Sequence, residues 1–269
     1  MTSGPGEEIA ATPDARRPAA FFDLDRTLMA GSSGLFWARA AYETGVIGRR
    51  QLASDGWANV KFRLNGSTDA ATDEVRERVC RMIEGHHEKE FARLAPRVLA
   101  GVLPRIYPQM LEVAYGHQDA GRQVYIATAA SQGLAELLAQ VLAFDGGLGS
   151  RYEVDADGVY TGREDGPFSY REGKAQRVRE LAAAEGIDLA ASYAYSDSES
   201  DLPLLRAVGN PVAVNPDVPL GRIAEQEGWE VLRFEQLGRR LKAFGAVGAA
   251  ALVGTAGATA ARGRRVPPA

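Results

Sequence analysis

Acidic and hydroxyl side chains directly follow three short apolar runs in the sequence. The runs are Ala19–Phe22, Val124–Ala127 and Tyr193–Tyr195, and each has the length of one buried strand. The residues that come after them are Asp23 and Asp25, then Thr128, then Asp197 and Asp201. In open α/β sheets, ligands bind beyond the carboxyl ends of the strands. The pattern therefore predicts one site in which these side chains lie close together.

A cluster of carboxylates at one edge of a sheet needs a positive partner. In a partly dry site, the acids would repel one another by several kcal/mol. A divalent cation removes that repulsion, and an all-oxygen ligand set with room for water favours Mg²⁺. Helix capping is the competing interpretation of the same residues. Capping explains one strand end better than it explains two pairs of acids, Asp23/Asp25 and Asp197/Asp201.

Lys174 follows Gly173 at the expected start of a helix. The helix dipole opposes a lysine in the first turn, and a phosphate or carboxylate partner would compensate. The segment is not a phosphate-binding loop of the Walker A type, because the required glycine spacing before Lys174 and the hydroxyl residue after it are missing. The position of Lys174 therefore favours an anionic partner.

Strand and helix patterns alternate along most of the chain. Two further strands are expected at 212–214 and 230–232, and helices at 133–143, 174–185 and 201–208. This alternation predicts an α/β fold built on a doubly wound parallel sheet. A hairpin is expected at 152–162, with Asp157-Gly158 as its turn.

Residues 34–100 break the alternation, because their apolar residues recur with helical spacing. We predict a helical insertion after the first strand, followed by a helix over 101–120 that leads into the second strand. The expected divisions are a disordered N-terminal tail (1–17), an α/β core (18–33 and 101–235), a helical cap (34–100) and an Ala/Gly-rich C-terminal tail (236–269).

The composition is that of an ordinary globular protein, with 45% hydrophobic and 25% charged residues. A formal net charge of -4 argues against a general nucleic-acid-binding protein, but a local positive cluster can still bind a small anion. The one cysteine, Cys80, permits no disulfide within the chain and is interpreted as structural. Because the N-terminal residues also lack the apolar stretch of a secretory signal, a cytoplasmic location is expected.

The uncharged segment 243–261 is rich in Ala and Gly and is flanked by arginines. As a helix, at ~1.5 Å per residue, it would be about as long as the hydrocarbon core of a bilayer is thick, and arginines suit the membrane interface. Ala and Gly contribute little transfer energy, however, and Thr255 and Thr259 weaken the pattern further. A mobile tail on a cytoplasmic protein is therefore favoured over membrane association through this segment.

Four short motifs, taken in their order, resemble those of the haloacid dehalogenase superfamily. They are Asp23-Leu24-Asp25-Arg26-Thr27, Thr128 at a strand end, Lys174, and Asp197-Ser198-Glu199-Ser200-Asp201. A single DxDxT motif is often found by chance, but four in order on the expected elements are specific. The resemblance extends over roughly residues 17 to 235 and is greatest to the phosphoserine-phosphatase-like subfamily IB. It implies a Rossmann-like core with a helical C1 cap.

The resemblance also implies a chemistry, namely hydrolysis of a small phosphorylated metabolite with Mg²⁺ through a phospho-aspartate. Asp23 would be the nucleophile on phosphorus. Asp25 would protonate the leaving oxygen and then activate water. This second acid separates the phosphatases of the superfamily from the dehalogenases, which are expected to lack it.

The remaining motif residues would bind the phosphate and the metal. Thr128, Lys174 and the backbone amide of Leu24 would contact phosphate oxygens, and Lys174 would also neutralise the nucleophile. The ligands implied for Mg²⁺ are Asp23, Asp197 and the backbone carbonyl of Asp25, with Asp201 acting through water or orienting Lys174.

Two positions depart from the pattern of the family. Characterised phosphoserine phosphatases have a glutamate nine residues after the nucleophile, where it contacts the substrate amine, and this chain has Ser32 there. We therefore expect that phosphoserine is not clearly preferred. Arg26 stands where Gly or Ser is common, and the sequence offers no function for it. The competing functions are a regulatory or binding protein on the same fold, and a phosphotransferase.

Overall fold

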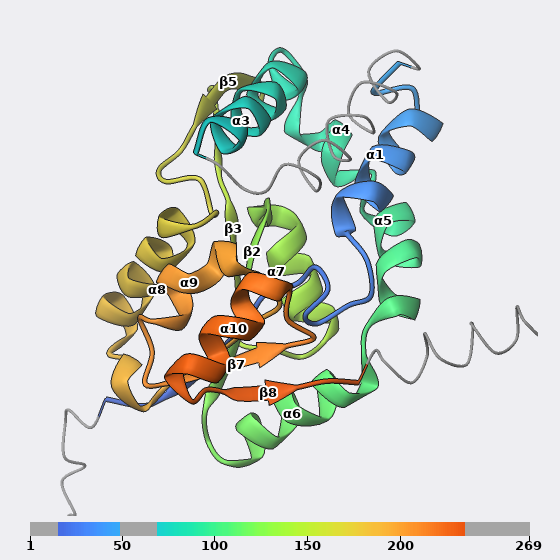
Figure 1. Cartoon of the computed structure of the whole chain (residues 1–269). Coiled ribbons are helices and arrows are strands. Elements are labelled where there is room, and N and C mark those ends of the chain that lie inside the picture. Colours follow the sequence, from blue (N-terminus) through green and yellow to red (C-terminus); the bar gives the residue numbers. More distant parts are fainter. Residues whose placement is uncertain (1–15, 49–68, 235–269) are drawn as a thin grey trace, which may run out of the picture. The chain divides into compact units, whose positions relative to one another are not determined.

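The structure, a computed structural model, describes residues 16–48 and 69–234 of the chain (Figure 1). The strands are β1 (Ala19–Phe22), β2 (Gln123–Ser131), β3 (Gly146–Ser150), β4 (Tyr152–Val154), β5 (Tyr160–Glu164), β6 (Tyr193–Ser196), β7 (Asn210–Val214) and β8 (Glu230–Leu232). The α-helices are α1 (Ser33–Glu43), α3 (Asp69–Ile83), α4 (Glu88–Ala92), α5 (Ala95–Val102), α6 (Pro108–Asp119), α7 (Gln132–Val141), α8 (Glu172–Glu185), α9 (Leu202–Leu205) and α10 (Val218–Glu227). Short 3-10 helices are η1 (Leu103–Arg105), η2 (Leu189–Ala191) and η3 (Glu199–Asp201).

Six strands form one sheet in the order β3-β2-β1-β6-β7-β8, and β4 pairs with β5 in a separate two-stranded sheet. The pairings β1–β2, β2–β3, β1–β6 and β6–β7 are parallel. The chain builds outward from β1 to β3, then returns to β6 on the other side of β1 and builds outward again. This confirms the predicted doubly wound parallel sheet. Its switch point lies between β1 and β6, the strands that are followed by Asp23 and Asp197.

Helices cover both faces of the large sheet. On one face, Phe21 and Tyr125 belong to a buried cluster that includes residues of α8, α9 and α10. On the other face, the ring of Phe22 stacks on Tyr195 with centroids 4.4 Å apart and meets His117 of α6 edge-on. Because both faces are covered, the central strands are apolar along their length rather than alternating.

The helices α1, α3, α4 and α5 lie between β1 and η1, and no named strand lies among the described residues there, in keeping with the predicted helical insertion. The β4–β5 hairpin packs with this insertion. The Gly85 N–H donates to the Tyr160 carbonyl at 2.9 Å, and Arg76 of α3 forms an ion pair with Glu164 of β5 at 2.8 Å. The two segments lie side by side although η1, α6, β2, α7 and β3 separate them in sequence (Figure 1). The domain limits expected from the sequence stay predictions.

Strand β3 is missing from the strands expected from the sequence, because Gly-Gly-Leu-Gly-Ser has low β-propensity. The structure shows why glycine is needed there. A Cβ on Gly147 would lie 2.3 Å from the backbone carbon of Ala135 in α7, and one on Gly149 would lie 2.7 Å from the backbone nitrogen of Gln132, the first residue of α7. The glycines therefore mark a close approach of α7 to the backbone of β3.

Two further boundaries differ from expectation. The single helix expected over 101–120 is divided into the end of α5, η1 and α6, because Pro104 and Pro108 lack the N–H that a continuous helix requires. Strand β2 runs to Ser131, so Thr128 lies within the strand rather than after it. The pairing of β2 with β3 shifts register after Ala127, so the strand is irregular where Thr128 stands.

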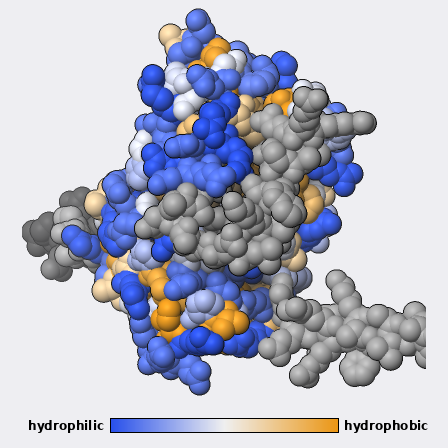
Figure 2. Space-filling view, turned by 45° about the horizontal axis from the view of Figure 1, so that its top comes forward, coloured by the Kyte–Doolittle hydropathy of each residue, from blue (hydrophilic) through white to orange (hydrophobic). Residues whose placement is uncertain are grey.

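Among the described residues on the face seen in Figure 2, hydrophilic ones predominate, and hydrophobic ones form smaller patches. The large apolar side chains that are exposed within the described residues are Leu35, Leu103, Tyr115, Val141 and Val218. In residues 16–48 and 69–234, no helix has both the length and the apolar character needed to span a membrane. The segment 243–261, with its two interpretations, lies outside the described residues.

Candidate active site

Asp23 lies directly after β1, where the chain turns sharply. The Asp23 N–H donates to the Tyr195 carbonyl of β6 at 3.0 Å, and the Asp23 carbonyl accepts from Leu28 at 3.2 Å. The Leu24 carbonyl accepts from Leu28 and Met29 at 3.1 and 3.0 Å. This turn leaves the Asp23 side chain only 10% exposed. The carboxylate is therefore fixed at the carboxyl edge of the sheet, beside the switch point.

Lys174 joins Asp23 to Asp201. Its Nζ donates to Oδ1 of Asp23 and to Oδ2 of Asp201, both at 2.8 Å, and its side chain is buried. The start of α8 reaches this position because it packs tightly on the preceding loop. A Cβ on Gly173 would lie 2.0 Å from the Phe168 carbonyl oxygen, so glycine is required there. Lys174 thus has the anionic partners that its place in the first turn favours.

The buried acids near Lys174 carry an excess of negative charge. Burial raises the pKa of Asp23 to about 7, with Lys174 opposing the rise and Asp201 adding to it. Burial lowers the pKa of Lys174, but pairing with Asp201 and Asp23 outweighs this and raises the pKa overall. Burial also raises the pKa of Asp197, to about 8, and the Asp23 carboxylate adds to it. A further cation at this edge would therefore stabilise the ionised acids.

Asp197, in the turn after β6, pairs with Arg26. One guanidinium nitrogen of Arg26 lies 2.5 Å from Oδ2 of Asp197, and the two side chains are 48% and 5% exposed. Arg26 adopts a left-handed backbone conformation with φ of 64°, which is uncommon for residues other than glycine. Arg26, for which the sequence offers no function, therefore directly contacts Asp197, one of the expected metal ligands.

Asp25 is held by the start of α1. Its Oδ2 accepts from the Ser32 hydroxyl, and its Oδ1 accepts from the Ser33 N–H, both at 2.8 Å. Ser32 is the N-cap residue of α1, and a helix N-terminus favours a negative charge nearby. Ser32, which stands where a substrate-binding glutamate is common, thus orients the second acid of the DxDxT motif.

Thr128 lies at the same edge of the sheet as Leu24. In the parallel pairing of β1 with β2, Phe22 is in register with Ile126, and Leu24 and Thr128 each come two residues later. Thr128 is 3% exposed, and its Oγ1 accepts from the Ala130 N–H at 3.2 Å. Its hydroxyl proton is therefore free to be donated to another acceptor.

The donor set fits a magnesium ion with two protein carboxylates. Asp23 and Asp197 are buried acids, and Oδ1 of Asp201 is buried without a hydrogen-bond partner within the described residues. In those residues, no three acidic, histidine or cysteine side chains are grouped as a metal site. The expected set does not require three, because it combines two carboxylates with the Asp25 backbone carbonyl and water. The ion would share Asp197 with Arg26.

The structure thus brings Asp23, Lys174 and Asp201 into direct contact, whereas no hydrogen bond within the described residues links Asp25 or Thr128 to them. Sequence reasoning did not single out Ser196, the last residue of β6. Its hydroxyl donates to Oδ2 of Asp201 at 2.7 Å. A hydroxyl residue at a strand end, directly before the acidic run, was the available signal.

Comparison with known proteins gives consistent results. Residues 20–206 match the haloacid dehalogenase-like hydrolase family. The chain is 35% identical over 253 residues to an inhibition of morphological differentiation protein of Streptomyces azureus, which covers 91% of each chain. It is 36% identical over 267 residues to a phosphoserine phosphatase of Mycobacterium tuberculosis (96% of this chain, 85% of the other). It is 30% identical over 220 residues to a histidinol-phosphatase of Neisseria meningitidis (80% of this chain, 98% of the other).

A solved structure gives the same picture of the fold. A protein of unknown function from Bordetella pertussis Tohama I superimposes with a TM-score of 0.71 at 32% sequence identity. The match covers 81% of this chain and 99% of the other.

Proposed function

This chain belongs to the haloacid dehalogenase-like hydrolases and is a phosphatase. We propose that it hydrolyses a small organic phosphate monoester through a phospho-aspartate on Asp23. The observation that carries the proposal is the contact of Lys174 with Asp23 at 2.8 Å. Lys174 bonds to Oδ1 only, and no described residue donates to Oδ2 of Asp23. One oxygen of the carboxylate is thus held and neutralised while the other is available to attack phosphorus.

The reaction proceeds in two displacements. In the first, an Asp23 oxygen forms a bond to phosphorus, the ester P–O bond breaks, and Asp25 donates a proton to the departing alkoxide. In the second, Asp25 takes a proton from water, the water oxygen attacks phosphorus, and the bond between Asp23 and phosphorus breaks to release inorganic phosphate. The hydrogen bonds from Ser32 and Ser33 keep Asp25 oriented through both steps.

The positive and neutral donors of the site have separate tasks. Lys174 neutralises the transferring phosphoryl group, and Asp201 keeps the ammonium in place from its other side. Thr128 and the Leu24 amide donate to phosphate oxygens. Mg²⁺, held by Asp23, Asp197 and the Asp25 carbonyl, would supply additional positive charge for the non-bridging oxygens.

The substrate is expected to be a small phosphorylated metabolite, with phosphoserine not clearly preferred. The relative from Mycobacterium tuberculosis is named a phosphoserine phosphatase, and the one from Neisseria meningitidis a histidinol-phosphatase. In this chain the Ser32 hydroxyl is bonded to Asp25 at 2.8 Å. Ser32 cannot pair with a substrate ammonium as a carboxylate does, which supports the expectation that phosphoserine is not clearly preferred.

The test is hydrolysis of p-nitrophenyl phosphate by the purified full-length protein, with Mg²⁺ and with EDTA. Turnover that requires Mg²⁺, together with mass-spectrometric detection of a phosphate adduct on the Asp23 peptide after acid quench, supports the proposal. Release of inorganic phosphate in the presence and absence of glycerol separates hydrolysis from phosphotransfer. Turnover that persists in EDTA, or an adduct on another residue, contradicts the proposal.

A further inference from the structure

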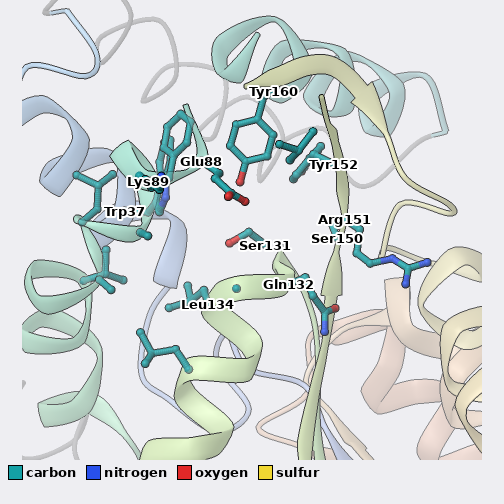
Figure 3. A pocket seen from close by; sticks show the side chains of 18 of the residues that line it. Trp37, Glu88, Lys89, Ser131, Gln132, Leu134, Ser150, Arg151, Tyr152 and Tyr160 are labelled. Atoms are coloured by element: carbon teal, nitrogen blue, oxygen red, sulfur yellow. The ribbon is translucent and has the colours of Figure 1, made fainter. Parts of the chain in front are cut away.

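A cavity of about 620 Å³ lies between the helical insertion, the β4–β5 hairpin and the start of α7 (Figure 3). Three groups of side chains line it. The insertion contributes Trp37, Glu88 and Phe91, the hairpin contributes Tyr152 and Tyr160, and the core contributes Ser131 and Leu134. A cavity of this size holds a ligand much larger than the three-carbon alcohol of phosphoserine.

The cavity lies at the same edge of the sheet as the candidate active site, although none of the site residues is among the residues that line it. Its floor includes Ser131 and Ser150, at the carboxyl ends of β2 and β3, and β2 is the neighbour of β1, with strands about 5 Å apart in a sheet. On the other side, α1 begins at Ser33, whose N–H binds Asp25. Trp37 comes one turn later, about 6 Å along the helix axis. A phosphate at Asp23 would thus place its ester group next to the cavity.

The wall contributed by the insertion and the hairpin is aromatic. The rings of Trp37 and Phe91 stack with centroids 5.5 Å apart, and Phe91 meets Tyr160 at 5.4 Å. Tyr160 meets Tyr152 edge-on at 6.5 Å. These rings brace one another, so they offer a planar ligand a preformed surface.

Two charged side chains that line the cavity, Glu88 and Lys89, have no ion pair in the described residues. Figure 3 shows the Glu88 carboxylate and the Tyr160 hydroxyl pointing to the same part of the cavity. The carboxylate and burial together raise the pKa of Tyr160, with burial the larger cause. The other acid at the rim, Asp165, already pairs with Arg151 at 3.3 Å, and Lys89 lies on the Trp37 side. The Tyr160 side of the cavity is therefore anionic and aromatic, a combination that suits an organic cation.

We propose that this cavity binds the alcohol part of the substrate, and that this alcohol carries both an aromatic ring and a cationic group, with the ring against Trp37 and Phe91 and the cation at Glu88 and Tyr160. The inference rests on the proposed phosphatase activity and narrows its substrate class. It assigns substrate specificity to the insertion and the hairpin, which pack together, and not to Ser32.

The test uses three phosphate monoesters that differ in one feature at a time. Tyramine phosphate has ring and cation, phenyl phosphate has the ring alone, and phosphoethanolamine has the cation alone. The first two are aryl esters with similar leaving groups, so their ratio isolates the cation. We expect kcat/KM for tyramine phosphate to exceed that for phenyl phosphate about fivefold, the modest gain of a charge pair partly exposed to solvent.

Two variants and one control assign this preference to residues. Glu88→Gln should lower kcat/KM for tyramine phosphate about fivefold and leave phenyl phosphate unchanged. Trp37→Ala should lower both aryl esters about tenfold and leave phosphoethanolamine unchanged. Glu112→Gln, an exposed acid on α6, should change none of the three rates. Equal loss for all three esters in Glu88→Gln, or no loss for any, overturns the proposal.

Binding separates this inference from the proposed activity. Calorimetry with the Asp23→Asn variant measures the affinity for tyramine phosphate and for phenyl phosphate without turnover. If Asp23→Asn prefers tyramine phosphate in binding, Glu88→Gln removes that preference, and the wild type hydrolyses neither ester, the proposed activity is refuted and the proposed role of the cavity is retained. Hydrolysis of all three esters with no preference in rate or binding would refute the cavity and keep the activity.

Discussion

The guanidinium of Arg26 lies 2.5 Å from the carboxylate of Asp197. Arg26 lies in the turn after β1, and Asp197 lies in the turn after β6, so the contact bridges the two strands at the switch point of the sheet. It joins an unusual residue of the DxDxT motif to an acid whose pKa burial has raised to about 8. Half of the arginine side chain remains exposed. The contact therefore supplies positive charge at the place where the expected cation would bind.

Replacement of Arg26 by Gln should strengthen Mg²⁺ binding. A unit positive charge about 5 Å from a divalent cation repels it, and in a water-like dielectric this amounts to about 1.5 kcal/mol, or on the order of tenfold in Kd. Isothermal titration calorimetry of the wild type and Arg26→Gln measures the change, with Arg39→Gln, an exposed arginine of α1, as the control. Weaker binding by Arg26→Gln would mean that Arg26 positions Asp197 as a ligand instead of competing for it.

The parts of the site that follow from strand ends could be predicted from the sequence. Asp23 and Thr128 come after or within apolar runs, and adjacent parallel strands carry them to one edge. Which acid pairs with which cation could not be predicted. Lys174 and Asp23 are 151 residues apart, and their contact depends on how α8 packs against the sheet. The pairing of Arg26 with Asp197 depends on a left-handed backbone conformation that no local pattern indicates.

The fold was predictable to a similar extent and for similar reasons. Continuous apolar runs identified the central strands, because both faces of the sheet are covered. Strand β3 could not be found in this way, because the close approach of α7 selects glycine at Gly147 and removes the β-branched residues that usually mark a strand. The contact of the hairpin with the helical insertion, as in the bond from Gly85 to Tyr160, is likewise set by tertiary packing.

Substitution of the two motif acids should separate the two displacements. Asp23→Asn should abolish turnover of p-nitrophenyl phosphate, because the amide cannot attack phosphorus. Asp25→Asn should lower steady-state turnover by about 10²–10⁴-fold, the usual effect of removing a general acid or base. Because p-nitrophenolate leaves without a proton, this variant should still show a burst of about one equivalent of nitrophenol and accumulate phospho-enzyme.

Rapid-quench kinetics measures that burst, and Asp119→Asn, an exposed acid on α6, serves as the control. Near-wild-type turnover by Asp23→Asn in a contaminant-free preparation would rule out the covalent mechanism. Slow turnover by Asp25→Asn with no burst would assign Asp25 to the first displacement alone.

Replacement of Lys174 by Met should destabilise the fold. The change leaves Asp23 and Asp201 buried without their shared cation, and removing one partner of a buried ion pair typically costs about 3–5 kcal/mol. Urea unfolding in EDTA measures the loss, and Lys89→Met, an exposed lysine, should change stability by less than about 0.5 kcal/mol. Part of the loss should return with Mg²⁺, since the ion replaces the missing charge. A decrease of less than about 1 kcal/mol in the free energy of unfolding would contradict this prediction and would indicate that Asp23 and Asp201 become protonated when Lys174 is absent.

Stability below neutral pH should depend on His117, which is buried in α6 on the face of the sheet that carries Phe22. The Nδ1 atom accepts a hydrogen bond from Nε of Arg122 at 2.7 Å, and Nε2 lies 2.7 Å from the Tyr195 hydroxyl. With Nδ1 acting as acceptor, the ring is neutral and Nε2 carries the proton. Burial, with a smaller contribution from Arg122, lowers the pKa of His117 to about 4.

This lowered pKa makes the folded protein lose stability as the pH falls. In the unfolded chain His117 takes up a proton near pH 6.5, whereas in the folded state it does so only near pH 4. Between pH 6.5 and pH 4 the unfolded state binds more protons than the folded state, so the contribution of His117 to the free energy of unfolding decreases as the pH is lowered. Above pH 6.5 this contribution is constant. The contribution of His117 to the free energy of unfolding should be about 2 kcal/mol lower at pH 5.0 than at pH 7.5.

Urea unfolding of the wild type and His117→Gln at both pH values isolates the contribution of His117, because the other titratable groups behave alike in both proteins. The variant should lose about 2 kcal/mol less than the wild type over this interval, and equal losses would mean that His117 is protonated in the folded state.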